Sequence, residues 1–202
     1  MKTIFIPAKS KSRVNSKKIL EISKKLPNNI AITYSIQFQE IAKDIKKILS
    51  KKHKITSFIQ VLGCSKPKFS KTDAVLLIGS GRFHAISLAC ETKLPIYILE
   101  KHNLSKITNQ DIEKLQKTKK AAYLKFLNAN KLGILISTKP GQNRLKHALN
   151  IKDQIKKKSY LFLSNNINTL EFENFTIDSY INTGCPRLDM DSTIINIQDI
   201  KP

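Results

Sequence analysis

Two of the three cysteines lie just after short apolar runs, where a thiol could bind a metal or act as a nucleophile. Cys64 follows Val61-Leu62-Gly63, and Cys185 follows Ile181-Asn182-Thr183-Gly184. Residues that turn the chain flank both, so we expect each thiol at the end of a strand, displayed at a sheet edge. Cys90 lies on an amphipathic helical stretch and is interpreted as a small buried hydrophobe.

The spacing of possible ligands leaves the chemistry of these thiols open. No C-x-x-C or H-x-x-x-H pair occurs, which disfavours a zinc site. A cysteine nucleophile would need a base, and none of His53, His84, His102 and His147 lies in a recognisable catalytic motif. Thiolates that hold an iron–sulfur cluster can be far apart in sequence, but two cysteines fall short of the usual set.

Arginine is rare in this chain, although positive charge is abundant. Only Arg13, Arg82, Arg144 and Arg187 are arginines among 36 basic residues. The planar guanidinium can bind a carboxylate or phosphate in a bidentate way that lysine cannot. All but Arg13 fall in short turns that contain glycine or cysteine, which favours an anionic ligand there; chance placement is the alternative.

Two turns between a strand and a helix could hold such an anion. Gly79-Ser80-Gly81-Arg82 could present backbone amides to it, with His84 as a pocket residue or as a helix cap. The turn lacks the dinucleotide fingerprint and the P-loop pattern, so a purely structural turn is an equal alternative. Thr138-Lys139-Pro140-Gly141-Gln142, followed by Arg144, is a second turn of this kind.

The composition predicts a folded protein with a strong positive charge. The hydrophobic fraction is 41%, and the formal net charge is +21. Such a charge is typical of partners of nucleic acid, but the lysines are spread along the chain without a clustered stripe, so a nucleic-acid surface is disfavoured. No apolar stretch could span a membrane, no signal peptide is recognisable, and the few cysteines favour a reducing cytoplasm.

Short apolar runs alternate with amphipathic stretches, which is typical of parallel sheets flanked by helices. Strands are expected over 4–6, 30–34, 57–62, 74–78, 96–99, 132–137, 160–163, 179–182 and 193–196, helices over 15–26, 38–49, 83–91, 111–128 and 143–156, and a short element over 170–172. The fold class is therefore α/β, with two similar small three-layer domains of flavodoxin or Rossmann type. The polar segment 101–108 sets the expected boundary between a domain over 1–105 and another over 106–202. Ligands of such sheets bind beyond the carboxyl ends of the strands, where both cysteines and both turns would gather.

Four segments together resemble the iron–sulfur 3-amino-3-carboxypropyl transferases of diphthamide biosynthesis. They are QVLGC at 60–64, IGSGRFH at 78–84, GILISTKPGQNR at 133–144 and IDSYINTGCPR at 177–187. They occur in the order of that family and span most of the chain. The chain is therefore identified as a member of the family, corresponding to its second and third domains.

The resemblance implies both a fold and a chemistry. Family members have three similar α/β domains, each of which gives one cysteine to a [4Fe–4S] cluster. The cluster binds S-adenosylmethionine and cleaves it to a 3-amino-3-carboxypropyl radical, which adds to a histidine of translation elongation factor 2. By resemblance Cys64 and Cys185 are the cluster ligands of the second and third domains. The residues expected near the methionine end of S-adenosylmethionine are Gly79, Ser80, Gly81, Arg82, His84, Thr138, Lys139, Gly141, Gln142, Arg144 and Arg187.

The family's first domain and its cysteine have no counterpart in this sequence, and Cys90 is not expected to replace that ligand. The first hypothesis is a split enzyme, in which a first-domain chain or a full-length paralogue completes the cluster in a homo- or hetero-oligomer. The second is a non-catalytic accessory subunit of a complete paralogue. The third is a basic module associated with nucleic acid or the ribosome on the same scaffold.

Overall fold

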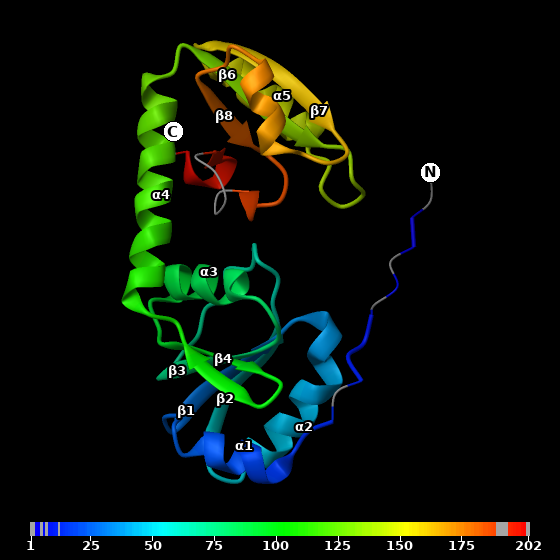
Figure 1. Cartoon of the computed structure of the whole chain (residues 1–202), viewed down its shortest axis with the longest axis vertical. Helices are drawn as coiled ribbons and strands as arrows, with labels where there is room; N and C mark the ends of the chain where they lie inside the picture. The colour runs from blue at the N-terminus through cyan, green and yellow to red at the C-terminus, as the bar shows by residue number, and fades with distance from the viewer. Residues whose placement is uncertain (1–2, 5, 7, 12, 189–193, 201–202) are drawn as a thin grey trace. The chain divides into compact units, whose positions relative to one another are not determined.

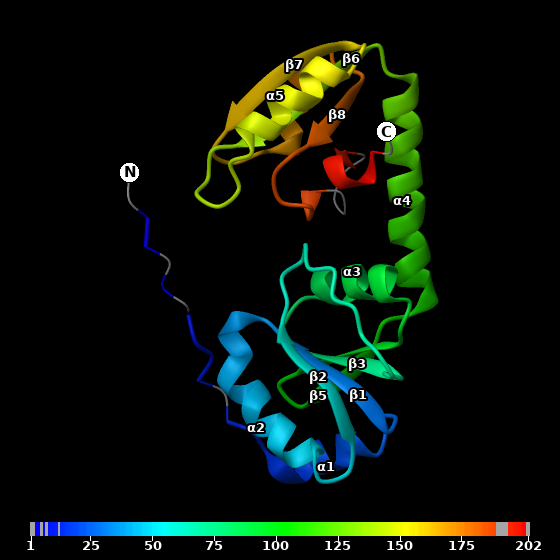
Figure 2. The ribbon, with the colours of Figure 1, turned by 180° about the vertical axis from the view of Figure 1, so that it is seen from behind.

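The computed structural model describes residues 3–4, 6, 8–11, 13–188 and 194–200 (Figures 1 and 2). The chain divides into two compact units, Met1–Ile112 and Glu113–Pro202. Among the residues described, no helix is both long and apolar enough to cross a membrane.

The first unit is built on a five-stranded sheet. Its strand order is β2(Lys54–Gln60), β1(Asn29–Tyr34), β3(Ala74–Ile78), β4(Ile96–Glu100) and β5(Asn103–Lys106). The first four strands are parallel, and β5 pairs with β4 in the antiparallel sense. All of β3 and most of β1 are buried, as expected for central parallel strands covered on both faces.

Helices cover both faces of this sheet (Figure 1). They are α1(Ser16–Ser23) and α2(Gln39–Leu49), which follows the 3-10 turn η1(Ile36–Phe38), and α3(Arg82–Thr92). Ile19 of α1 and Ile45 of α2 pack against Ile32 and Leu76 of the sheet, while α3 lies on the opposite face. Asn15 caps α1 by accepting a hydrogen bond from the Lys18 amide at 3.2 Å.

The second unit has a four-stranded, all-parallel sheet. Its strand order is β7(Lys158–Ser164), β6(Lys131–Ser137), β8(Ser179–Asn182) and β9(Ile195–Asn196). The remaining elements are α4(Asn109–Asn128), which begins in the first unit, α5(Leu145–Gln154) and the 3-10 turns η2(Thr169–Asn174) and η3(Ile197–Asp199). Phe126 of α4 and Ala148 of α5 pack on one face of the sheet.

The other face of the second sheet is aromatic. Tyr180 stacks on Phe172 of η2 with ring centroids 4.1 Å apart, and its hydroxyl donates to the Phe172 carbonyl at 3.2 Å. A Cβ added at Gly133 would lie 2.4 Å from the Tyr180 ring, so this position requires glycine. In the described part of this unit the aromatic face is therefore covered by a 3-10 segment, where the first unit has α3.

The two sheets share one strand order. Counted along the chain within each unit, both run second, first, third and fourth, and the first unit adds the antiparallel β5 at its edge. This order confirms the predicted α/β class and the predicted repetition of one architecture.

The structure differs from the predicted elements in several places. Ile4 and Ile6 lie outside any strand and are 85% and 86% exposed, whereas Phe5 lies outside the described residues. Apolar character alone does not make a strand, because a strand also needs a neighbour for its backbone hydrogen bonds. The prediction missed β5, since this polar edge strand needs only backbone pairing with β4. The strand predicted over 57–62 runs over Lys54–Gln60.

Candidate functional site

Cys64 lies in a tight turn beyond the end of β2. Val61, 1% exposed, anchors the segment by donating its amide to the Tyr34 carbonyl of β1 at 2.9 Å. The Ser65 amide donates to the Leu62 carbonyl at 3.0 Å, and the Leu62 amide donates to Ser65 Oγ at 2.8 Å. These bonds close the turn Leu62–Ser65 and leave Cys64 as an exposed, free thiol.

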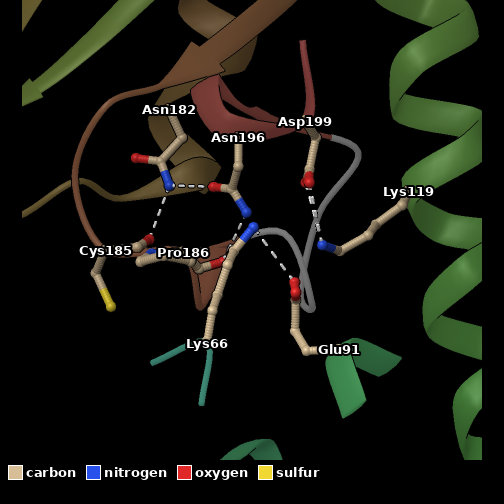
Figure 3. Close-up of polar contacts among 8 residues, drawn as sticks. All are labelled: Lys66, Glu91, Lys119, Asn182, Cys185, Pro186, Asn196 and Asp199. Atoms are coloured by element: carbon tan, nitrogen blue, oxygen red, sulfur yellow. Dashed lines mark hydrogen bonds and ion pairs between the residues drawn. The ribbon is translucent and has the colours of Figure 1, made fainter. Parts of the chain in front are cut away.

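The aromatic ring of Phe83 supports this turn. A Cβ added at Gly63 would come within 1.9 Å of the ring, so the ring lies directly against the glycine backbone. Phe83 also contacts the half-buried His84 ring, with centroids 5.4 Å apart. Lys66 and Glu91 of α3 add an ion pair at 3.5 Å (Figure 3). The segment around Cys64 therefore contacts α3 in the first unit, through Phe83 near the start of the helix and through Glu91 near its end.

The glycine turn before α3 has the geometry of a helix start. Gly81 is the N-cap residue of α3 and has a φ of 91°, a conformation that favours glycine. Gly79 is buried, whereas Ser80, Gly81 and Arg82 are exposed. Among the described residues, no side-chain hydrogen bond caps the N-terminus of this helix.

Arg82 has a partner within its own unit. One of its guanidinium nitrogens donates to Asp111 Oδ2 at 2.6 Å. The same oxygen accepts from the Thr108 hydroxyl and amide at 2.7 and 3.0 Å. Hydrogen bonds from Thr108, and then the Arg82 charge, lower the pKa of Asp111 below its usual value. A ligand at Arg82 would therefore compete with a carboxylate of the chain.

Cys185 follows β8 in the second unit, and two buried asparagines hold its loop (Figure 3). Asn182 ends β8 and Asn196 ends β9, and they are 1% and 2% exposed. The Asn182 side-chain amide donates to the Cys185 carbonyl at 2.7 Å and to Asn196 Oδ1 at 2.6 Å. We call this pair of side chains the asparagine clamp.

Further hydrogen bonds of the clamp fix the backbone on both sides of the cysteine. Asn182 Oδ1 accepts from the Gly184 amide at 2.9 Å, and the Asn196 side-chain amide donates to the Pro186 carbonyl at 3.1 Å. Cys185 is half-buried, and its sulfur points away from both asparagine amides (Figure 3). The clamp thus binds the Cys185 backbone and leaves its free thiol available.

A pocket of about 310 Å³ lies beside this thiol in the second unit. Its lining residues are Ser137, Lys139, Gln142, Asn165, Ile167, Cys185, Arg187 and Leu188. Four predicted site residues therefore meet here: Lys139, Gln142, Cys185 and Arg187. The charged groups that line the pocket in the described part of the unit are the cations Lys139 and Arg187, so its electrostatics favour an anion.

A turn positions two of these side chains. The Gln142 amide donates to the Lys139 carbonyl at 3.0 Å, and Gly141 has a φ of 79°. Proline followed by a positive-φ glycine is typical of a type II turn. Thr138, Gly141 and Arg144 are exposed and lie outside the pocket lining, with Arg144 at the N-cap of α5.

The two asparagines of the clamp, and also Ser137 and Asn165, were not among the predicted site residues. Asparagine is depleted in strands, so Asn182 and Asn196 at the ends of apolar runs were a usable signal of a polar role. Nothing in the sequence indicated that their side chains contact each other.

The other thiol and imidazole groups lie elsewhere. His53 is buried, with Nδ1 donating to the Pro27 carbonyl at 2.8 Å and Nε2 bonded to Ser23 Oγ at 2.7 Å, which is a structural role. Cys90 is half-buried within α3. Over the residues that the structure describes, no group of three or more His, Cys, Asp or Glu side chains could hold a metal ion.

The structure thus defines two α/β units of one strand order, each with a free cysteine on a hydrogen-bonded turn after a parallel strand. A family model of diphthamide synthesis proteins matches residues 1–194. The chain belongs to this family.

Curated relatives agree with this membership. The chain is similar to the 2-(3-amino-3-carboxypropyl)histidine synthase of Pyrococcus horikoshii, with 29% identity over 94% of this chain and 60% of that protein. It is also 28% identical to the synthase of Methanocaldococcus jannaschii, over 96% of this chain and 58% of that protein. The chain therefore spans about three fifths of the length of these relatives.

A solved structure is similar over the same extent. Dph2 from Pyrococcus horikoshii with a 4Fe-4S cluster matches with a TM-score of 0.78 and 27% identity, covering 93% of this chain and 61% of that one. This likeness supports the α/β fold of both units.

Proposed function

We propose that Cys64 and Cys185 each supply one thiolate to a [4Fe–4S] cluster of a diphthamide synthase. The observation that carries this proposal is that each unit offers one free thiol on a turn whose backbone is hydrogen-bonded. Thiolate sulfur is the donor that such clusters use. The similarity to a solved protein that contains a 4Fe-4S cluster supports the same assignment.

Two thiolates are fewer than a cluster of this type requires, so a further thiolate must come from outside the described sites. We propose that another segment or polypeptide, either a first-domain chain or a full-length paralogue, provides it in a homo- or hetero-oligomer.

The substrate proposed for this assembly is S-adenosylmethionine. When bound, the cluster would supply the electron that breaks a carbon–sulfur bond of the sulfonium, so that the 3-amino-3-carboxypropyl group is transferred to a histidine of translation elongation factor 2. A translation elongation factor as the protein substrate implies that the assembly acts in the cytoplasm.

The residues of this chain would orient the amino-acid end of that substrate. Lys139 and Arg187 line the pocket beside Cys185 and would bind a carboxylate, while Gln142 would donate a hydrogen bond. Gly79, Ser80, Gly81 and His84, next to the Phe83 ring that supports the Cys64 turn, would contribute from the first unit. Among the predicted residues Arg82 is the weakest candidate, because Asp111 already binds it.

The test is an anaerobic assay of S-adenosylmethionine cleavage, with and without the candidate partner. We expect cleavage in the reconstituted complex and its loss in Cys64→Ala and in Cys185→Ala. Cys90→Ala is the matched control and should retain cleavage. If the complex cleaves S-adenosylmethionine equally well with both ligand cysteines replaced, the proposal fails.

The second candidate is an accessory subunit that does no chemistry itself. Of the three free cysteines in the described part of the chain, two lie on turns after strands, and this small number of candidate ligands favours the alternative. In that case a full-length paralogue alone would cleave S-adenosylmethionine, and the alanine variants of this chain would leave cleavage unchanged.

A further inference from the structure

A separate cavity of about 260 Å³ lies in the first unit, at the carboxyl ends of β3 and β4. Its lining residues are Arg13, Val14, Ile19, Phe38, Ile41, Ile45, Ile78, Leu99, Lys101 and His102. Ile19, Ile45 and Ile78 are each 1% exposed, so fully buried core residues form its floor. The crevice beyond the carboxyl ends of parallel strands is the usual ligand position in α/β sheets.

Cationic and polar groups line the same cavity. Arg13 and Lys101 are exposed, and Lys101 directly follows β4 with a φ of 56°. The Asn15 amide donates to His102 Nε2 at 3.3 Å, so the neutral ring carries its proton on Nδ1, where it can donate. No Asp or Glu is among the residues that line the cavity in the described part of the unit.

This cavity is not part of the cysteine sites described above. It shares no lining residue with the pocket beside Cys185, and no residue of the turn Leu62–Ser65 contributes to it. Arg13 is also the one arginine that lies outside the glycine- and cysteine-containing turns. The function proposed for the cysteines therefore assigns no ligand to this cavity.

We propose that this cavity binds a small amphiphilic carboxylate. The apolar group lies among the isoleucines, and the carboxylate binds Arg13 and Lys101. At about 260 Å³ the cavity is slightly smaller than the usual small-molecule pocket of about 300–1,000 Å³, which suits a short alkyl chain with one polar head. Apolar walls with a few placed polar groups are the usual composition of a small-molecule site.

Octanoate is the probe for this site. It would be titrated into the full chain, carrying labelled isoleucine methyl groups, at physiological salt so that the net charge of +21 is screened. We expect saturable shifts of the methyl signals of Ile19, Ile41, Ile45 and Ile78. Hexanoate should bind more weakly, by about fourfold for each methylene lost.

Three variants separate the site from general attraction to a basic protein. Arg13→Gln and Lys101→Asn each remove a charge of the cavity, and asparagine tolerates the positive φ of position 101. Each should weaken octanoate binding by roughly tenfold. Lys51→Gln removes an exposed charge outside the cavity and should bind like the unaltered chain.

The alcohol 1-octanol tests the role of the carboxylate, and it should bind at least tenfold more weakly than octanoate. Thermal unfolding of each variant establishes that it is folded. Equal binding of octanol and octanoate, equal weakening by Lys51→Gln, or shifts outside the four isoleucines would each overturn the proposal.

Discussion

The two units share a strand order but carry their cysteines at different places in it. Cys64 follows β2, the second strand of its unit and an edge strand, whereas Cys185 follows β8, the third strand, which has neighbours on both sides. The position after β3, which corresponds to that of Cys185, is the Gly79-Ser80-Gly81 turn. The thiols are therefore not copies of one repeated loop.

This difference has a physical consequence for the two turns. The loop after β8 can use partners from β6 and β9, and it does so: Thr183 Oγ1 donates to the Leu135 carbonyl at 2.7 Å, and Asn196 completes the clamp. The edge turn of Cys64 relies on its own Ser65 and on the packing of Phe83 against Gly63. Buried hydrogen bonds hold one thiol, and aromatic packing with an exposed turn holds the other.

The largest expected effect comes from removing the asparagine clamp. Asn182→Ala would leave the buried Asn196 Oδ1 without this donor, and would remove one hydrogen bond each from the half-buried Cys185 carbonyl and Gly184 amide. A buried group left unsatisfied costs about 1–3 kcal/mol and each further hydrogen bond lost about 0.5–1.5 kcal/mol, so we expect a loss of at least about 2 kcal/mol in unfolding free energy. Denaturant unfolding measures it; a loss below about 1 kcal/mol would show that the clamp is not needed.

The next effect tests the aromatic support of Cys64. In Gly63→Ala the added methyl overlaps the Phe83 ring, so the ring or the turn must move, at a cost of about 1–3 kcal/mol. The double variant Gly63→Ala, Phe83→Ala should be less destabilised than the sum of the two single variants. If the losses of unfolding free energy in the two single variants simply add up in the double variant, the Phe83 ring is not what excludes a side chain at position 63.

A pH dependence is expected at the start of α4. The pKa of Asp111 is lowered in the folded state, so its stabilising effect is complete above the unfolded value of about 4 and is lost as pH falls through the folded value. The unfolding free energy of Asp111→Asn should therefore fall less between pH 5 and pH 2 than that of the unaltered chain. If the unfolding free energies of the two proteins fall equally between pH 5 and pH 2, the stabilising role of the ionised Asp111 is contradicted.

The smallest effect is expected at the hydroxyl of Ser65. Ser65→Ala removes one hydrogen bond from a turn that water can reach, and should cost only about 0.5–1.5 kcal/mol. The losses of unfolding free energy in Ser65→Ala and in Asn182→Ala, compared with each other, measure how differently the two turns are held. If Ser65→Ala costs as much as Asn182→Ala, the two thiols are held in similar ways.

The sequence predicted the fold through its apolar runs, because central parallel strands such as β3 and β6 are buried on both faces. The edge strand β5 is mostly polar and has no apolar run, so the sequence did not predict it. The turns that carry both cysteines followed from residue types, and anion binding by Lys139 and Arg187, which line one pocket, stays a prediction.

Long-range side-chain pairs could not be predicted. The contact of Asn182 with Asn196 depends on the register of β8 against β9, and the Arg82 pair with Asp111 depends on how α3 and α4 begin. Neither pairing has a periodic pattern along the chain. Such contacts arise only when the fold brings together residues that the sequence separates.

The most direct test of the central claim is the iron and sulfide content of the partnered protein after anaerobic reconstitution. We predict one cluster in the unaltered chain and in Cys90→Ala, and a loss of most of the iron in Cys64→Ala and in Cys185→Ala. A full content of iron and sulfide in either of these two variants would contradict the claim that both thiols bind the cluster.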